Sequence, residues 1–436
     1  MGKFDSISNM MERKVMPIAN KMAGQRHLAA IRDAFISLLP INLMGGITAI
    51  IKSPPVTEDT TNGFLLAWQS LVTSEQASVI LGWLYAFTLG AMSLYICVGV
   101  THFLCRHYKI NNFIPILFSI LGFFLIVTNP IELGWSSKSL EFSYIDGKGL
   151  IPALFVSIFT TELYRFMKEK NFGKISMPPS VPPSLSDVFA SLIPGMCIIL
   201  SYIVIFAIFN GIGTTLPRFI FETLTPAFKA ADSLIFVILI TVLTHVLWFF
   251  GIHDAALSGI VGPIRDGNLS MNATAKVAGE SLEYIFTTPF WVYFVAIGGC
   301  GAVMGLAIIL MKVKSKQLKT VGRVGIIPAF FGISEPLIFG IPLMLNPMFF
   351  IPFIFAATFN AVVSFLLMDI GMIAKTFSLV SWNMPSIFGA FFSTLDLKAS
   401  ILIVVLTVID LFIYYPFVKI YDKQLYEKEQ GDVKEA

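Results

Sequence analysis

Long stretches without a charged side chain recur along this chain and dominate its pattern of polar and apolar positions. A helix needs about 20 apolar residues to cross a bilayer, and eight stretches come close to or exceed that length. We expect a transmembrane helix in each of them, although the last contains Asp410. They are Ala34–Ile51, Gln76–Phe103, Ile110–Ile131, Val188–Pro217, Ser233–Ile252, Tyr284–Met311, Pro336–Met368 and Ala399–Tyr415.

Two weaker stretches complete the set of expected spans. Gly149–Thr161 is short, but it extends to Phe166 if its flanking charged side chains reach the membrane surface. Thr376–Leu395 is long enough but contains Pro385 and Gly389. Together with the eight clearer spans, these predict an all-α polytopic membrane protein with about ten transmembrane helices.

Two segments are apolar or weakly polar yet rich in helix breakers. Gly251–Glu283 contains Pro263 and Gly267, and Val324–Pro342 is interrupted several times by proline and glycine. Irregular backbone survives at membrane depth only where protein or a water-filled cavity satisfies its polar groups. Paired interrupted segments are typical of transporter binding sites near the membrane midplane. We therefore expect a binding site beside these two segments.

Amphipathic and proline-rich segments flank these spans. Phe4–Met22 repeats apolar residues every three or four positions with Lys and Arg between them, which predicts an interfacial helix on the cytoplasmic surface. Pro217–Ala231 is a second candidate, and Met177–Ser186 is a proline-rich linker. We expect four parts. They are an N-terminal membrane half (1–176), a linker with one span and a connector (177–231), a C-terminal membrane half (232–421) and a tail (422–436).

The distribution of Lys and Arg orients the first half. Six lie in the first 33 residues, two in 104–109 and four in 162–187, against one, two and two in the intervening loops 52–75, 132–148 and 218–232. The excess of positive charge marks the cytoplasmic side, so we expect the N-terminus to be cytoplasmic. The four lysines of the tail after Tyr415 predict a cytoplasmic C-terminus as well. The basic cluster at 312–323 fits only if part of 218–311 is re-entrant, half-crossing or crosses once more.

Composition supports the membrane class and narrows the chemistry. The 436 residues are 56% hydrophobic and only 13% charged, with a net charge of +3 and a mean hydropathy of +0.79. No basic face suits nucleic acid, and the four cysteines form no Cys-x-x-Cys pair. No Walker loop, metal-ligand cluster or cleavable signal peptide is present. We expect no cofactor and no metal.

A few polar side chains lie within or beside the apolar segments. Glu335 sits in Gly-Ile-Ser-Glu-Pro inside a broken segment, where its carboxylate could bind a hydroxyl or act as a general base; pairing with a lysine or capping a half-helix is the structural alternative. His253 can both donate and accept a hydrogen bond, or it could be satisfied by backbone at a helix end. Asp254 could bind ligand or cap the next helix. Trp248 and Trp382 could contact a sugar or serve as packing.

Three stretches resemble a known family. They are Lys14–Phe35, Trp248–His253 and, most specific, Gly332–Phe353 with Gly-Ile-Ser-Glu-Pro-Leu-Ile-Phe-Gly-Ile-Pro. In these, the chain is similar to the enzyme IIC membrane subunits of the lactose, cellobiose and N,N'-diacetylchitobiose phosphotransferase systems. The resemblance implies a homodimer with N-terminal halves at the interface and sugar in the C-terminal halves. It also implies two re-entrant hairpins that line the site, in agreement with the two broken segments.

The resemblance also implies the chemistry. A β-linked disaccharide would be received from outside and phosphorylated at its 6-hydroxyl by a phosphocysteine of a separate enzyme IIB, itself supplied by enzyme IIA. The motif places His253 on a neighbouring hydroxyl and Glu335 as the residue that orients and deprotonates the 6-hydroxyl. Asp254 and Ser334 stand where many relatives carry glycine and asparagine, so we expect both to affect sugar recognition. The main alternative is an ion-coupled secondary sugar transporter.

Overall fold

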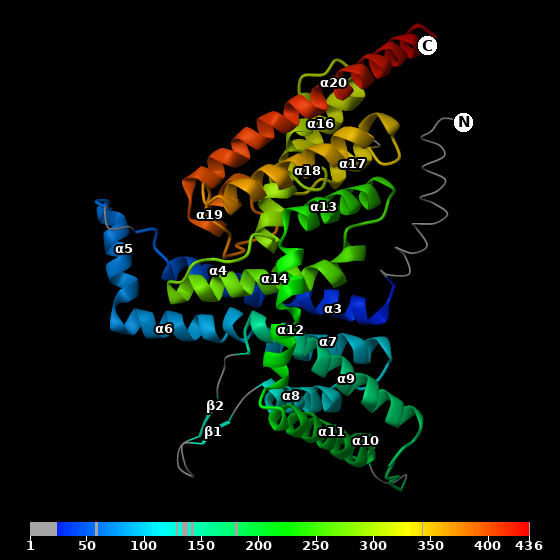
Figure 1. Ribbon diagram of the computed structural model, residues 1–436. Coiled ribbons are helices and arrows are strands. Elements are labelled where there is room, and N and C mark those ends of the chain that lie inside the picture. Colours follow the sequence, from blue (N-terminus) through cyan, green and yellow to red (C-terminus); the bar gives the residue numbers. More distant parts are fainter. Residues whose placement is uncertain are drawn as a thin grey trace.

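The computed structural model describes residues 24–56, 60–127, 130–132, 138–140, 144–178, 182–341 and 343–435. Helices account for nearly all of the regular structure in these ranges (Figure 1). The one sheet there is an antiparallel pair, β1 (Pro130–Glu132) and β2 (Lys138–Leu140), with Ile131 opposite Ser139. The amphipathic helix expected over Phe4–Met22 lies outside the described residues.

The first predicted span is two helices with a sharp bend. α3 (Arg26–Ser37) and α4 (Leu39–Lys52) meet at an angle of 49°, so the prediction of one helix over Ala34–Ile51 is wrong. Pro40 lies in the first turn of α4, a position where its missing N–H is tolerated but where a continuous helix is interrupted.

The remaining N-terminal helices form a bundle around α7 (Met92–His107). α5 (Gly63–Thr73) and α6 (Glu75–Ala86) project from one side of it (Figure 1), and a short 3₁₀ turn η2 (Leu89–Ala91) joins α6 to α7. α8 (Phe113–Val127), 3₁₀ turn η3 (Gly147–Gly149), α9 (Leu150–Glu169), α10 (Pro183–Ala190) and α11 (Leu192–Gly211) complete the bundle. α10 begins inside the predicted proline-rich linker Met177–Ser186 and continues past its end, because proline is well tolerated in the first turn of a helix.

Close packing in this bundle depends on one glycine and one tyrosine. Tyr202 of α11 is fully buried, and a Cβ on Gly122 of α8 would lie 2.2 Å from its ring. The Tyr202 hydroxyl lies 2.5 Å from the Thr160 hydroxyl of α9 and donates to the Val156 carbonyl at 3.0 Å. A buried polar group needs such partners, so the three helices are fixed in one arrangement.

α12 (Leu216–Ala231) connects the two halves and confirms the helix predicted over Pro217–Ala231. It runs across the direction of the neighbouring helices (Figure 1). The C-terminal half follows with α13 (Leu234–Phe249), α14 (Ala255–Ala278), π-helix η4 (Phe290–Val295), α15 (Met304–Leu310), α16 (Lys316–Phe330), α17 (Glu335–Gly340), α18 (Pro347–Asp369), α19 (Ser386–Thr394) and α20 (Leu397–Glu435).

The two predicted re-entrant segments have different outcomes. Val324–Pro342 was correctly predicted to be broken: α16 and α17 form a helical hairpin around a turn at Gly332, whose φ is +78°. Gly251–Glu283 is mostly the single helix α14, whose 24 residues span about 36 Å. An additional crossing within 218–311 was one way to place the basic cluster at 312–323 on the cytoplasmic side. α14 is long enough to be that crossing.

The broken backbone lies one segment later, in the predicted span Tyr284–Met311. It consists of an extended stretch, η4, a glycine-rich turn and the short α15. Two side chains of α14 satisfy its polar backbone: Asn268 donates to the Phe286 carbonyl at 2.9 Å and Asn272 to the Tyr284 carbonyl at 2.6 Å. The polar residues that made α14 look like a loop are thus partners of its irregular neighbour.

The apolar helices are those of a polytopic membrane protein. In the described part of the chain, five helices are long and apolar enough to cross a bilayer, and the bent pair α3–α4 gives a sixth. Three shorter apolar helices, α5, α8 and α13, accompany them. The fold class is confirmed, while the number of long uninterrupted spans is lower than the ten predicted because several spans are bent or broken.

Candidate functional site

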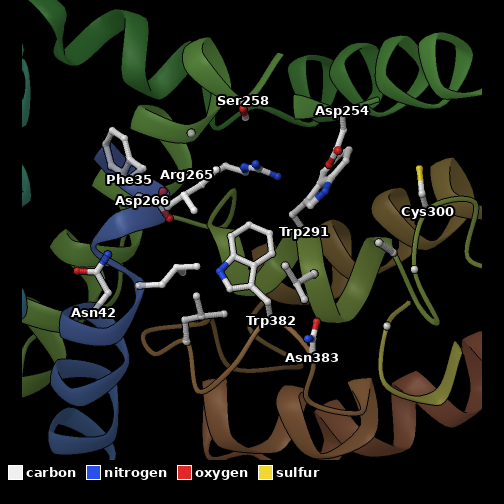
Figure 2. A pocket seen from close by; sticks show the side chains of 18 of the residues that line it. Phe35, Asn42, Asp254, Ser258, Arg265, Asp266, Trp291, Cys300, Trp382 and Asn383 are labelled. Atoms are coloured by element: carbon white, nitrogen blue, oxygen red, sulfur yellow. The ribbon is translucent and has the colours of Figure 1, made fainter. Parts of the chain in front are cut away.

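A cavity of about 370 Å³ lies between the bent helix pair α3–α4 and the C-terminal half (Figure 2). This volume is within the range of small-molecule binding sites. Segments far apart in the sequence meet around it, from α3, the α13–α14 connection, α14, η4, the α16–α17 turn and the residues before α19. All six side chains singled out in the sequence line this cavity, namely Trp248, His253, Asp254, Ser334, Glu335 and Trp382.

The α13–α14 connection presents an imidazole and a carboxylate. Gly251 has a φ of +87°, a conformation that glycine adopts without steric cost, and it turns the chain at the end of α13. His253 Nδ1 lies 2.7 Å from the Asp254 carboxylate, and the Trp248 ring packs on the imidazole with centroids 4.7 Å apart. The contact of Nδ1 with Asp254 fixes the orientation of the imidazole.

The α16–α17 turn presents Ser334 and Glu335. Ser334 is buried, and its hydroxyl accepts a hydrogen bond from the Cys300 N–H at 3.1 Å. Glu335 is half-buried and is the first residue of α17, so its negative charge lies at the favourable end of a helix. The glycine-rich turn before α15 thereby holds the Glu335 backbone against the cavity.

A close approach of two backbones makes this arrangement possible. Gly299 has a φ of +102°, and a Cβ there would lie 2.6 Å from Cβ of Ser334 and 2.8 Å from its nitrogen. Only glycine combines that backbone conformation with the absence of a side chain. The glycine pattern of 298–301 therefore serves the site, although its position in the sequence gives no sign of this.

Trp382 reaches into the cavity from the extended segment before α19 (Figure 2). The Tyr293 hydroxyl of η4 donates to the Ser381 carbonyl at 2.5 Å and accepts from the Ser381 N–H at 3.2 Å. This double contact fixes the residue that precedes Trp382. The indole is 39% exposed whereas Trp248 is only 5% exposed, so Trp382 offers the more open apolar face.

Several polar residues of the cavity were missed in the sequence. Arg265 and Asp266 of α14, with Ser258 and Gly262, line it together with Trp291 of η4. Their spacing of three and four residues marks one face of a helix. That signal was overlooked because the proline and glycines of 251–283 suggested a broken segment.

Asn42 and Arg32 also line the cavity, and no local sequence signal identifies them. They reach the site only because α3 and α4 bend beside it. By contrast, His245, which lies within the predicted span Ser233–Ile252, is not among the residues that line the cavity. It is fully buried, with Nδ1 2.8 Å from the Thr241 carbonyl and its ring between Trp291 and Phe353, which is a structural role.

The cavity combines hydrogen-bonding groups with aromatic faces. Carboxylates accept, the guanidinium of Arg265 donates, and imidazole and hydroxyl groups do both. Such a lining suits a small neutral ligand with many hydroxyl groups and apolar C–H faces. Over the described part of the chain, no group of three or more His, Cys, Asp or Glu side chains is arranged to hold a metal ion.

The comparisons with known proteins agree with this reading of the cavity. Residues 32–357 match the family model described as phosphotransferase system, EIIC. The lichenan permease IIC component of Bacillus subtilis is 31% identical over 98% of this chain and 96% of that protein. The lactose-specific EIICB component of Staphylococcus haemolyticus is 32% identical over 96% of this chain and 71% of that longer protein.

One solved structure is similar over nearly its whole length. It is the transporter ChbC, the IIC component from the N,N'-diacetylchitobiose-specific phosphotransferase system, with a TM-score of 0.88 and 30% sequence identity. The similarity covers 97% of this chain and 99% of that one. The chain therefore belongs to the EIIC family of sugar phosphotransferase systems and is a multi-pass membrane permease subunit.

Proposed function

We propose that this permease binds a β-linked disaccharide in the cavity, carries it inward and presents its 6-hydroxyl for phosphorylation by enzyme IIB. The observation that carries the proposal is the meeting of Glu335 and His253, 82 residues apart in sequence, on one cavity that also contains Trp382. The names of the relatives, lactose, lichenan and N,N'-diacetylchitobiose, support a sugar of the cellobiose, lactose or chitobiose type.

Each residue has a role in this proposal. Glu335 orients the 6-hydroxyl and accepts its proton as the phosphoryl group is transferred. His253 holds a neighbouring hydroxyl, while Asp254 sets the orientation of the imidazole. Trp382 lies against an apolar sugar face, and Trp248 supports the imidazole from behind. Phosphoryl transfer depends mainly on positioning and charge stabilisation, so a fixed carboxylate beside the hydroxyl is an appropriate device.

The phosphoryl donor in this proposal is a phosphocysteine of enzyme IIB, which is recharged by enzyme IIA. Relatives named EIICB components support an enzyme IIB partner. Both termini of this chain lie on the cytoplasmic side, where the donor is, and two copies associate through their N-terminal halves. The four parts expected over 1–176, 177–231, 232–421 and 422–436 correspond to dimerisation, connection, sugar binding and a cytoplasmic tail.

The test uses the purified permease in liposomes with a panel of cellobiose, lactose and N,N'-diacetylchitobiose. We expect one of them to bind in titration calorimetry and to appear inside the vesicles as its 6-phosphate only when phosphorylated enzyme IIB is enclosed there. Accumulation of unmodified sugar driven by a proton or sodium gradient alone would contradict the proposal and favour an ion-coupled transporter.

A further inference from the structure

A hydrogen bond from α20 reaches the turn that supports Glu335. Tyr414 of α20 is fully buried and is not among the residues that line the cavity. Its hydroxyl donates to the Gly301 carbonyl at 2.7 Å. In the same turn, the Cys300 N–H donates to the hydroxyl of Ser334, which directly precedes Glu335. Two hydrogen bonds therefore connect a side chain outside the cavity to the backbone that carries Glu335.

The turn between η4 and α15 has little rigidity of its own. Three of its glycines have positive φ angles, +81° at Gly298, +102° at Gly299 and +84° at Gly301. Glycine reaches a wider range of backbone conformations than any other residue and loses more conformational freedom when it is fixed. Contacts with neighbouring elements must therefore select the conformation that is observed. The hydroxyl of Tyr414 supplies one such contact and the hydroxyl of Ser334 supplies another.

The part of α20 that bears Tyr414 is held firmly against its neighbours. A Cβ on Gly305 of α15 would lie 2.5 Å from the Leu411 nitrogen, so the backbones of the two helices approach closely there. One turn before Tyr414, the Asp410 carboxylate accepts a hydrogen bond from the Asn360 amide of α18 at 2.9 Å. Close packing of this kind leaves a side chain little room to shift. The Tyr414 hydroxyl therefore holds the turn from a fixed support.

We propose that Tyr414 is a positioning residue for phosphorylation, which acts through the glycine-rich turn and Ser334 on the carboxylate of Glu335. The inference rests on the proposed function, because it assumes that Glu335 accepts the proton of the 6-hydroxyl. In that step the 6-oxygen forms a bond to phosphorus, the phosphorus–sulfur bond of the enzyme IIB phosphocysteine breaks, the thiolate leaves with the electron pair and the proton goes to Glu335. Because phosphoryl transfer depends mainly on positioning, a contact that fixes the carboxylate affects the rate without touching the sugar.

The variant that tests this role is Tyr414→Phe, which keeps the ring and removes only the hydroxyl. Displacement of a catalytic group by about 1 Å can lower a rate roughly 100-fold. We expect the single-turnover rate of phosphorylation by enzyme IIB to fall at least about 10-fold at saturating disaccharide. The dissociation constant of the disaccharide should change less than about 3-fold, because His253 and Trp382 lie on other segments. Calorimetry on the full-length permease in detergent gives this constant and the number of intact sites, so the rate is expressed per intact site.

Tyr202→Phe is the matched control. Tyr202 is as fully buried as Tyr414, and its hydroxyl also donates to a backbone carbonyl, that of Val156 at 3.0 Å. It lies in the N-terminal bundle and is not among the residues that line the cavity. Its removal should lower the melting temperature but leave the phosphorylation rate per intact site within about 2-fold of the wild type. A merely structural contribution of Tyr414 would give the same result.

A double-mutant cycle determines whether Tyr414 acts through Glu335. Single-turnover rates are compared for the wild type, Tyr414→Phe, Glu335→Gln and the double variant. If the tyrosine works by placing the carboxylate, its removal should cost less than about 2-fold further in Glu335→Gln. If it only stabilised the permease, its effect on the rate would be the same in both backgrounds.

Ser334→Ala provides an independent measurement if Tyr414→Phe does not fold. It removes the acceptor of the Cys300 N–H and so breaks the same connection nearer to the cavity. The phosphorylation rate should fall when Ser334→Ala is made in the wild type and should be nearly unchanged when it is made in Glu335→Gln. An equal loss in both backgrounds would overturn the proposal.

The outcomes separate the two proposals. If the wild type binds no disaccharide, or if Glu335→Gln keeps the wild-type rate, the proposed function fails and this inference fails with it. If Glu335→Gln lowers the rate while Tyr414→Phe keeps the wild-type rate, only this inference is overturned. The same fold-loss from Tyr414→Phe in the presence and absence of the Glu335 carboxylate would assign the tyrosine a structural role and would equally overturn it.

Discussion

In the proposed function, single residues decide the chemistry of the cavity, and the charge of Glu335 is expected to matter most. Glu335→Gln keeps the size and hydrogen-bonding capacity of the side chain but cannot take up a proton from the 6-hydroxyl. We expect disaccharide affinity to fall less than about 10-fold while the rate of phosphorylation by enzyme IIB falls at least about 100-fold. Calorimetry and single-turnover phosphorylation measure the two effects separately.

Glu283→Gln is the control for this prediction, because Glu283 is a well-exposed carboxylate that pairs with Lys229 outside the cavity. It should leave both binding and phosphorylation unchanged. Unchanged phosphorylation in Glu335→Gln would remove the general-base role and leave Glu335 with a structural role at the start of α17.

Gly299 also matters as a single residue, because its missing Cβ lets its backbone approach that of Ser334 closely. Gly299→Ala introduces strain at a φ of +102° and places Cβ 2.6 Å from Ser334. We expect the Ser334–Glu335 turn to move. The rate of phosphorylation should fall at least about 10-fold, and the free energy of unfolding should fall by about 2–3 kcal/mol from strain and clash together.

Gly371→Ala separates the two causes. Gly371 has a φ of +73° but nothing within 4 Å of its Cβ position, so this variant has the backbone strain alone. It should lower the melting temperature by a smaller amount and keep phosphorylation. Equal behaviour of the two variants would show that the close approach to Ser334 is unimportant.

Among the elements, the long helix α20 holds the hairpin that bears Glu335. Asp422 accepts hydrogen bonds from the N–H groups of Lys314 and Ser315, the latter at 2.7 Å. Glu429, two turns further, accepts from the Ser315 hydroxyl at 2.7 Å and from the Lys316 N–H at 2.9 Å. Two carboxylates of α20 thus cap the start of α16 with charge-assisted hydrogen bonds.

Removing these caps tests their contribution. Asp422→Asn should lower the free energy of unfolding by about 1–2 kcal/mol. Glu429→Gln should also lower the melting temperature, and both variants should increase amide hydrogen exchange at the start of α16. Lys423→Ala is the control on the same helix. Lys423 is exposed, and its ion pair with Glu427, one turn away, is long at 3.8 Å. Unchanged exchange in both carboxylate variants would show that α16 is held by packing alone.

A second element contact predicts a pH dependence. Asp232, between α12 and α13, accepts from the N–H groups of Ile285 at 3.0 Å and Phe286 at 2.5 Å and so anchors the extended stretch before η4. Burial raises the pKa of Asp232 from 3.8 to about 6. Between these values the folded protein holds a proton that the unfolded chain has released, so its stability falls as the pH rises.

The matching measurement is thermal unfolding between pH 4 and 7. In the wild type the melting temperature should contain a component that declines toward pH 6 and is absent from Asp232→Asn, which carries no titrating group there. An identical pH profile in both proteins would contradict the assignment.

For the whole molecule, the main prediction concerns association of two copies. α5 and α6 project from the body of the protein (Figure 1), and they carry large exposed apolar side chains, including Phe64, Leu71, Ile80 and Trp83. An exposed apolar surface of this kind contacts either lipid or another protein, and we expect the second copy of the predicted homodimer to pack here. We expect Ile80→Ala combined with Trp83→Ala to shift the detergent-solubilised protein from dimer toward monomer in light scattering.

Lipid also covers apolar side chains, so the control must be an equally exposed pair elsewhere. Ile401→Ala with Phe412→Ala on α20 removes side chains that are 63% and 68% exposed without touching α5 or α6. This pair should leave the mass unchanged. A wild-type protein that is monomeric throughout would contradict the predicted homodimer.

The family motif and the apolar spans could be read locally, whereas the paths of several spans could not. A run of apolar residues indicates that a segment is shielded from water. A helix and an extended chain whose backbone is hydrogen-bonded by neighbouring side chains both meet that condition. Thus 284–303 looked like a plain span although Asn268, Asn272 and Asp232 satisfy an irregular backbone there. For the same reason α14 was not predicted as a helix, because its polar side chains suggested a loop.

The sequence by itself determined that this is an all-helical membrane protein of the EIIC family, since hydropathy and the Gly-Ile-Ser-Glu-Pro motif are properties of contiguous residues. It also identified six residues that share one cavity. Only the tertiary structure decided that Arg32, Asn42 and Trp291 join them, because their place depends on the bend between α3 and α4 and on the packing of η4. Contacts between distant segments are set by that packing, and no local pattern encodes them.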